Sequence, residues 1–535
     1  MRIFFIITLF LASLSPAVAQ DSAYADIGSR AIRAHTTFLA DDLLEGRDAG
    51  TTGYDIAARY VAAAFDGIGL RPANDGKWFQ EVPFVQLDLR GNEHAVISVG
   101  GHRLSPDARI LLSNEGETRW VGEAVFAGYG ITSKSNGLDE IGKLDVRGKV
   151  VVVFEGAPFR MKPDDTARYS DSYKELGAVG LIRIATSDAA AARKARKALA
   201  TSGAETSTAV ITVKPPLMLD RPIAKSLTNF EIFIDPSDAR HLFEGASTKF
   251  DDILSKADRG ERLSSFDLSQ TVSVSGSLAA QRFHSPNVIG LLPGSDPKLS
   301  DEFILVIAHL DGLGADNLGV KNGALDNAAG VAILIETARA FAETGNAPRR
   351  SILFAAVTAE EDGLLGSQWL SDNPMPHAEN IVGVVNLDMP VLLYDFKDIV
   401  AFGSDQSTIG ITVEAALKSE GLSLSPDPIP EQGIFRRSDH YSFVKRGIPS
   451  VFLLTGFANG GEQVFENFMS NVYHTVGDNL SQPIDWSMAA RFARVNFAVT
   501  KALADADQRP LWYEDSPIGR QFAKGELKAK RAPAD

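Results

Sequence analysis

Residues 280 to 508 alternate between apolar runs and amphipathic periodic segments, and this alternation constrains the fold of the 535-residue chain more than any other feature. Continuous apolar runs predict buried strands at 303–308, 351–358, 381–389 and 449–454. Helical periodicity predicts helices at 328–344, 410–420 and 487–504. Alternation of this kind is typical of an α/β fold, in which helices flank a mostly parallel central sheet.

The segment before this region has a different character. Between about 91 and 278 strand-like runs dominate, among them 121–129 and 150–154, and candidate catalytic side chains are few. His102 and His241 stand alone in the sequence there and predict no site. We therefore expect a β-rich module at 91–278, inserted between an N-terminal part at 20–90 and the main part of an α/β domain at 279–508, with a charged tail at 509–535.

The first nineteen residues have the pattern of a signal peptide. Arg2 provides a positive charge, residues 3–14 are nearly all apolar, and Ala17-Val18-Ala19 matches an A-x-A cleavage signal. Cleavage after Ala19 predicts a periplasmic or extracellular protein. No later stretch is apolar and long enough to predict a membrane span, so none is expected after cleavage.

Charge and cysteine content exclude several classes of function. The chain has 53 basic and 68 acidic residues, a formal charge of -15, which argues against nucleic acid as a partner because phosphate binding needs a basic face. Cysteine is absent, which rules out disulfides, a thiolate nucleophile and a cysteine-ligated metal.

Chemically reactive side chains gather where the expected strands end. Two histidines and five carboxylates lie at strand ends or in the adjoining loops: His309, Asp311, Asp326, Glu360, Glu361, Asp388 and His474. The carboxyl ends of parallel strands meet at one edge of a sheet, where ligands of such folds bind. Imidazole nitrogens and carboxylate oxygens there predict a metal site.

The number of ligands indicates two metal ions. One bridging carboxylate, with one histidine and one carboxylate for each ion, uses five residues, supplied by His309, Asp326, Glu361, Asp388 and His474. Glu360 remains free beside a ligand, as a general base needs to be. Asp311 follows His309 by two residues and can accept the second ring N–H of that histidine.

Several short motifs carry a resemblance to a known family. Segment 279–508 resembles the zinc-dependent exopeptidases that include bacterial leucyl aminopeptidase, aminopeptidase S and glutamate carboxypeptidase. The motifs are AHLDGLG at 308–314, NGALDNAAGVA at 322–332, TAEEDGLLGS at 358–367, NLDM at 386–389, RSDHYSF at 437–443 and VYHTVGDNL at 472–480. Residues 44–70 resemble the leading helix of that family. FAGYGI at 126–131 and DVRGKVVVV at 145–153 resemble a protease-associated domain inserted into the catalytic fold.

The resemblance implies a phosphorylase/hydrolase-like zinc peptidase fold and a role for each residue. His309 and Asp388 would hold one zinc ion, Glu361 and His474 the other, and Asp326 would bridge them, with a cis peptide bond after it. Cobalt or manganese could substitute for zinc.

The implied activity is that of a metalloaminopeptidase acting on peptides with a free N-terminus. Glu360 would activate a metal-bridging water, Asp311 would orient His309, and Tyr473 would steady the oxyanion. Asp439 and His440 would contact substrate or support the site.

Other readings remain open. A glutaminyl-peptide cyclotransferase shares this fold and most of these ligands, but often has Ser where this chain has Asn327. A carboxypeptidase of the same fold would use arginines such as Arg436 or Arg437 to receive a terminal carboxylate. A binding protein that had lost its metals should lack some of the ligands, and all five are present here.

Overall fold

The computed structural model describes residues 27–89, 96–104, 109–112, 116–133, 137–142, 144–158, 167–168, 176–191, 217–220, 230–375 and 380–531. The expected signal peptide lies outside these residues. The chain divides into two units: the first combines the N-terminal part as far as Val82 with Ser285 onward, and the second is Pro83–His284. The expected insert at 91–278 lies within the second unit. Both unit boundaries fall inside long strands, β2 (Phe79–Leu89) and β14 (Phe266–Leu292), which no change in composition marks.

The first unit is built on a mixed sheet with a parallel centre. Strands β18 (Ser351–Val357), β15 (Phe303–His309), β19 (Ile381–Leu387) and β22 (Ser450–Thr455) pair side by side in parallel. Antiparallel partners flank them: the end of β14 beside β18, and β20 (Asp398–Phe402) beside β22. This confirms the predicted α/β fold with a mostly parallel central sheet.

Apolar side chains of the central strands alternate between two buried layers. Ile304, Val306 and Ala308 of β15 join the larger hydrophobic core, whereas Phe303, Leu305 and Ile307 join the core on the opposite face. Every residue of β15 is buried, as expected for a parallel strand covered on both faces.

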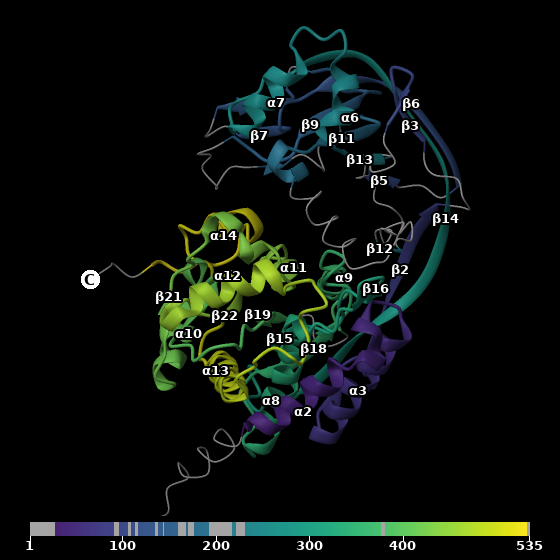
Figure 1. The fold of residues 1–535 in the computed structure, drawn as a ribbon. Coiled ribbons are helices and arrows are strands. Elements are labelled where there is room, and N and C mark those ends of the chain that lie inside the picture. The colour runs from purple at the N-terminus through teal and green to yellow at the C-terminus, as the bar shows by residue number, and fades with distance from the viewer. Residues whose placement is uncertain are drawn as a thin grey trace, which may run out of the picture. The chain divides into compact units, whose positions relative to one another are not determined.

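Helices cover both layers. The larger core contains residues of α2 (Ser29–Leu39), α3 (Thr52–Ile68), α8 (Ala329–Glu343) and α13 (Trp486–Asp505), which Figure 1 shows near one another. The opposite core contains residues of α9 (Leu365–Asp372) and α11 (His440–Val444). The helices predicted at 328–344, 410–420 and 487–504 are confirmed as α8, α10 (Ile409–Ser419) and α13. Asp485 begins α13 by accepting the N–H groups of Ser487 and Met488.

The second unit has its own sheet and its own core. Parallel strands β6 (Gly116–Phe126), β9 (Val150–Phe154), β11 (Gly180–Ile184) and β13 (Phe230–Ile234) form its centre. The first part of β14 pairs antiparallel with β6 and with β3 (Val96–Val99). Helices α6 (Pro236–Ala239), η3 (Arg240–Phe243) and α7 (Phe250–Asp258) contribute to its hydrophobic core. The strand-rich character predicted for this segment is therefore present, together with short helices.

Candidate metal centre

Asp326 lies between two histidines in the first unit. One carboxylate oxygen, Oδ1, is 3.2 Å from Nε2 of His309, and the other, Oδ2, is 3.4 Å from Nε2 of His474. His309 also lies 3.1 Å from Oδ1 of Asp388, and His474 lies 3.1 Å from Oε2 of Glu361. Two groups of three donors, each able to hold a metal ion, thus share Asp326.

The sheet brings these side chains together at the carboxyl ends of its parallel strands. His309 is the last residue of β15, Asp388 follows β19, and Glu360 and Glu361 follow β18 by a few residues. Asp326 lies in the irregular turn η4 (Ala324–Ala328) that leads into α8. His474 follows α12 (Gly461–Asn471). Residues other than glycine seldom adopt left-handed backbone angles, yet three do so here: Ala359, Met389 and His474.

Asn327 ties the turn of Asp326 to two strand ends. The peptide bond between Asp326 and Asn327 is cis, as the resemblance implies. The Asn327 side-chain amide donates to the carbonyl of Leu387 at 2.9 Å and to that of His309 at 3.3 Å. Its oxygen accepts the backbone N–H of Met389 at 3.2 Å. The position of Asp326 is therefore fixed relative to the ends of β15 and β19.

The carboxylate of Asp311 differs from its expected role. We expected it to accept the second N–H of His309, but it lies 3.8 Å from Nδ1, beyond hydrogen-bond distance, and the nearer acceptor is the Asp311 backbone carbonyl at 3.3 Å. The two carboxylate oxygens instead accept the backbone N–H groups of Glu360 and Glu361, at 3.1 and 3.2 Å. Asp311 therefore holds the glutamate pair in place, and His309 is oriented by main chain.

Burial and charge shift the pKa values of these groups. Burial raises the pKa of Glu360 well above its usual range, and it raises that of Asp311 to about 8. Burial opposes ionisation of Asp326 as well, but hydrogen bonds to His309 and His474 outweigh it and hold the pKa of that carboxyl below its usual range. Burial similarly disfavours the charged form of His474, yet Asp326 and Glu361 raise its pKa to about 9. The histidines thus sit in a strongly anionic environment that suits a cation.

Two residues that sequence reasoning missed hold the loops of this centre. Asp478 accepts the backbone N–H groups of Leu325 and Asp326, at 2.9 and 3.0 Å. Arg47 is 1% exposed and donates to the carbonyls of Leu39, Leu310, Asn322 and Gly323. Both lie inside motifs that carry the family resemblance, at 472–480 and 44–70, so position within a motif was the available signal.

Ser438 supports a further ligand. Its hydroxyl donates to Oδ2 of Asp388, and it accepts from the side chain of Asn386 at 2.6 Å. Ser438 thus binds one carboxylate oxygen of Asp388, and the other oxygen, Oδ1, lies 3.1 Å from Nε2 of His309.

Three further residues predicted from the sequence, Tyr473, Asp439 and His440, have different surroundings. The ring of Tyr473 stacks on that of His474, with centroids 3.7 Å apart. Asp439 is fully buried and lies near enough to Glu360 and His309 to interact with their charges, and burial raises its pKa to about 7. His440 packs between Phe435 and Phe452, and burial lowers its pKa to about 3, which favours the neutral ring. Neither metal-binding group of this unit includes His440.

A small hollow adjoins the centre. Its lining includes Asp326, Glu361, His474, Lys321 and Leu313. A larger hollow of about 440 Å³ lies at α9, α11 and the segment 509–527, and none of the predicted site residues lines it. The larger hollow therefore does not mark the candidate metal centre, which is identified by its two groups of metal donors.

An α/β fold with this donor set belongs to the metal-dependent hydrolase class. Residues 287–500 match the family described as Peptidase family M28, which places this segment in that family and confirms the resemblance seen in the sequence.

Comparisons with individual proteins agree with this assignment. A probable zinc metalloprotease of Pyricularia oryzae is 28% identical over 41% of this chain and 50% of its own length. Leupeptin-inactivating enzyme 1 of Streptomyces exfoliatus is 30% identical over 32% of this chain and 36% of its own length. The chain thus matches half, or less, of the length of these curated relatives. An aminopeptidase of Aneurinibacillus sp. strain AM-1 has the same fold, with a TM-score of 0.54 at 19% identity over 92% of this chain and 97% of its own.

Proposed function

We propose that this chain is a secreted di-zinc aminopeptidase that hydrolyses the N-terminal peptide bond of peptides. The observation that carries the proposal is the position of Asp326. One of its oxygens lies near His309 and the other near His474, and Asp326 belongs to both groups of metal donors. A carboxylate shared in this way is what a bridging ligand of a two-metal site requires.

The donors fit zinc in type and number. His309, Asp388 and one oxygen of Asp326 would hold one ion, and His474, Glu361 and the other oxygen of Asp326 would hold the second. Three protein ligands for each ion leave a coordination position free, as catalytic zinc sites do. Zinc bound there supplies Lewis acidity, which lowers the pKa of water and polarises the peptide carbonyl. Cobalt or manganese would be accepted by the same donors.

The side chains of this protein perform the proton transfers. Glu360 takes a proton from the attacking water and returns it to the leaving amine, because it is the carboxylate of the glutamate pair that lies outside both donor groups. Asp311 holds the backbone at Glu360 and Glu361 and so fixes the direction in which the base points. Tyr473, held by stacking on His474, would place its hydroxyl to steady the oxyanion.

Location and domain roles complete the proposal. The signal peptide predicted at 1–19 would direct the chain to the periplasm or outside the cell. In the part of the chain that the structure describes, no helix is both long and apolar enough to cross a membrane. The second unit would be a protease-associated module, because the motif at 126–131 begins at the last residue of β6 and the motif at 145–153 leads into β9 of its sheet.

Metal content and reaction products test this function together. The mature chain would be analysed for metal per chain and incubated with Leu-, Ala-, Lys- and Gln-leading peptides, in free, N-acetylated and C-amidated forms. We expect two zinc ions per chain and release of the first residue from free and amidated peptides but not from acetylated ones. Glu360→Ala should retain zinc and lose activity by about 10²–10⁴-fold, the typical contribution of a general base.

Controls separate this function from its rivals. Glu466→Ala, an exposed position on α12, should leave activity unchanged. One zinc ion with a pyroglutamyl product would indicate a cyclotransferase. Loss of activity on amidated rather than acetylated peptides would indicate a carboxypeptidase. Absence of both metal and product would indicate a binding protein.

A further inference from the structure

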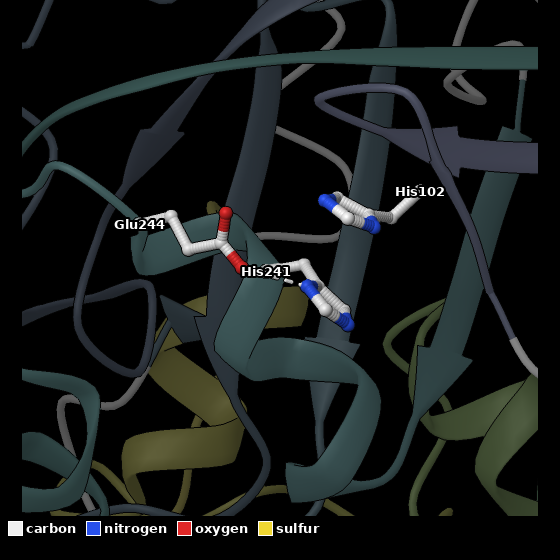
Figure 2. Close-up of side chains that lie close together, drawn as sticks. All are labelled: His102, His241 and Glu244. Carbon is white, nitrogen blue, oxygen red and sulfur yellow. Dashed lines mark hydrogen bonds and ion pairs between the residues drawn. The ribbon is translucent and has the colours of Figure 1, made fainter.

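A second group of potential metal ligands lies in the second unit, apart from the zinc donors of the first. His102 comes from β4 (His102–Arg103), His241 from η3, and Glu244 directly follows η3. One donor atom from each lies within 4.8 Å of the others. Figure 2 shows the two imidazoles facing each other, with the carboxylate of Glu244 beside His241.

The three side chains are already arranged toward one another. The imidazole rings are nearly parallel, with centroids 4.5 Å apart and planes inclined by 14°. Oε1 of Glu244 lies 2.8 Å from Nδ1 of His241. The spacing of three residues on one helical turn places those two side chains on the same face. Imidazole nitrogens are common metal ligands, and two of them lie side by side here.

The backbone holds the two segments together. Gly100 and Gly101, both with positive φ, join β3 to β4, and the N–H of Gly100 donates to the carbonyl of Thr271 at 3.0 Å. The neighbouring side chain of Gln270 donates to the carbonyl of Glu244 at 2.8 Å. Strand β14 thus anchors both the hairpin that carries His102 and the turn that carries Glu244. Leu242, next to His241, is fully buried and fixes η3 to the core.

The neighbouring positive charge of Arg240 is paired with a carboxylate other than that of Glu244. The guanidinium of Arg240 makes an ion pair with Asp251 at 2.7 Å and lies over the ring of Phe250. The ion pair of Arg240 is thus with Asp251, and the carboxylate of Glu244 lies against His241. The side chains of His241 and Glu244 are 37% and 54% exposed, which gives an ion access from solvent.

We propose that His102, His241 and Glu244 form a binding site for a divalent transition-metal ion, distinct from the peptidase centre. Two imidazoles and one carboxylate suit Zn²⁺, Cu²⁺ or Ni²⁺ rather than Mg²⁺ or Ca²⁺, which prefer oxygen ligands. Zinc binds such donors at about 2.0–2.2 Å, so small rotations of these exposed side chains would close the group around an ion. The ion would take the position of the proton between His241 and Glu244, and solvent would complete its coordination.

Zinc titration of the full chain tests the site. The peptidase centre is first loaded with zinc, free metal is removed, and further zinc is titrated by calorimetry with protein at tens of micromolar. Wild type should take up one additional equivalent, with a matching increase in metal per chain by elemental analysis. His102→Ala, His241→Ala and Glu244→Gln should each weaken this binding at least tenfold. His284→Ala, an exposed histidine of the same unit outside the group, should not.

A spectroscopic probe and a folding control complete the test. With Cu²⁺ as probe, the additional equivalent should show nitrogen hyperfine coupling in the paramagnetic resonance spectrum, lost in His241→Ala and kept in His284→Ala. Circular dichroism should show the same thermal midpoint for all metal-free variants. No additional equivalent in wild type, or equal uptake by wild type and all three site variants, would overturn the proposal. An unfolded His241→Ala would leave the decision to Glu244→Gln, which changes one atom.

Discussion

The backbone N–H of Glu360 donates to the carboxylate of Asp311 across 3.1 Å, and the next N–H along the chain donates to the other oxygen of the same group. Asp311 thus positions both a proposed base and a proposed ligand. Asp311→Ala should reduce kcat by about 10–100-fold, the usual effect of removing a residue that orients a metal site. Steady-state kinetics together with zinc affinity would measure it.

The control for this variant is the exposed Asp301, whose change to alanine should alter neither quantity. Asp311→Asn keeps one acceptor oxygen and should fall between wild type and Asp311→Ala. An Asp311→Ala variant with unchanged kcat would contradict the positioning role.

Asp478 holds the turn that carries Asp326. Its change to alanine leaves two buried N–H groups without an acceptor, at a cost of about 1–3 kcal/mol for each. We therefore expect a lower thermal midpoint and weaker zinc binding, measured by calorimetry. Asp478→Asn should show a smaller loss because one acceptor remains.

A matched comparison is the N-cap Asp485. Its change to alanine should cost about 1 kcal/mol of stability and leave zinc affinity unchanged, because its side chain accepts hydrogen bonds from Ser487 and Met488 at the start of α13. Equal effects of the two variants on zinc affinity would contradict a local role for Asp478.

The sequence predicted the sheet and the donors because both depend on local patterns. Apolar runs locate β15, β18 and β19, and the side chains that follow them must meet at one edge of a parallel sheet. His309 and Asp388 come together for that reason alone. The cis bond after Asp326 followed from the family resemblance rather than from any local pattern.

Contacts made through the backbone could not be predicted in this way. Arg47 donates to four backbone carbonyl groups, and every residue has such a group whatever its side chain. Asp311 likewise accepts backbone N–H groups, which nearly every residue can supply. His102 and His241 are far apart in the sequence; β3 pairs with both β4 and β14, and Gln270 of β14 donates to the carbonyl of Glu244, which follows His241 by three residues. Their proximity depends on strand register, which composition does not reveal.

Arg47 is a buried cation that joins distant loops. Lysine has one ammonium in place of the planar fork, so Arg47→Lys should lose about 1.5–3 kcal/mol of unfolding free energy for each lost charge-assisted hydrogen bond. Urea unfolding of the first unit would measure the loss. Arg59→Lys, an exposed change on α3, should stay within about 0.5 kcal/mol of wild type. Similar losses for both variants would contradict the bridging role of Arg47.

Metal removal should destabilise the first unit as well as inactivate it. Asp326, Glu361 and Asp388 lie close together beside His309 and His474, and a cation between them would offset the repulsion among their negative charges. A ligand that binds only the folded state at 1,000 times its Kd adds about 4 kcal/mol. Dialysis against a chelator should therefore lower the thermal midpoint, and added zinc should restore both midpoint and activity. Equal midpoints with and without zinc would argue against binding at this centre.

Glu140 gives the second unit a pH-dependent stability. Its Oε2 accepts the backbone N–H groups of Tyr129 and Ile131, at 3.0 and 2.8 Å, and the side chain is buried. Burial outweighs these hydrogen bonds and raises the pKa to about 7 from 4.5. Because the folded state holds this proton more tightly, the contribution of Glu140 to stability is complete below about pH 4.5 and is lost as the pH rises through 7. The difference is at most about 3.4 kcal/mol, at 1.36 kcal/mol per pKa unit.

Glu140→Gln should remove that dependence while keeping the contacts, since a single amide oxygen can accept both N–H groups that now share Oε2. Hydrogen exchange of β9, measured by mass spectrometry at pH 5 and 7.5 and corrected for the intrinsic exchange rate, reports the stability of this unit separately. Wild type and the exposed control Glu123→Gln should both lose protection at the higher pH, and Glu140→Gln should lose less. If all three proteins lose the same protection, ionisation of Glu140 does not lower the stability of the second unit, and the prediction is wrong.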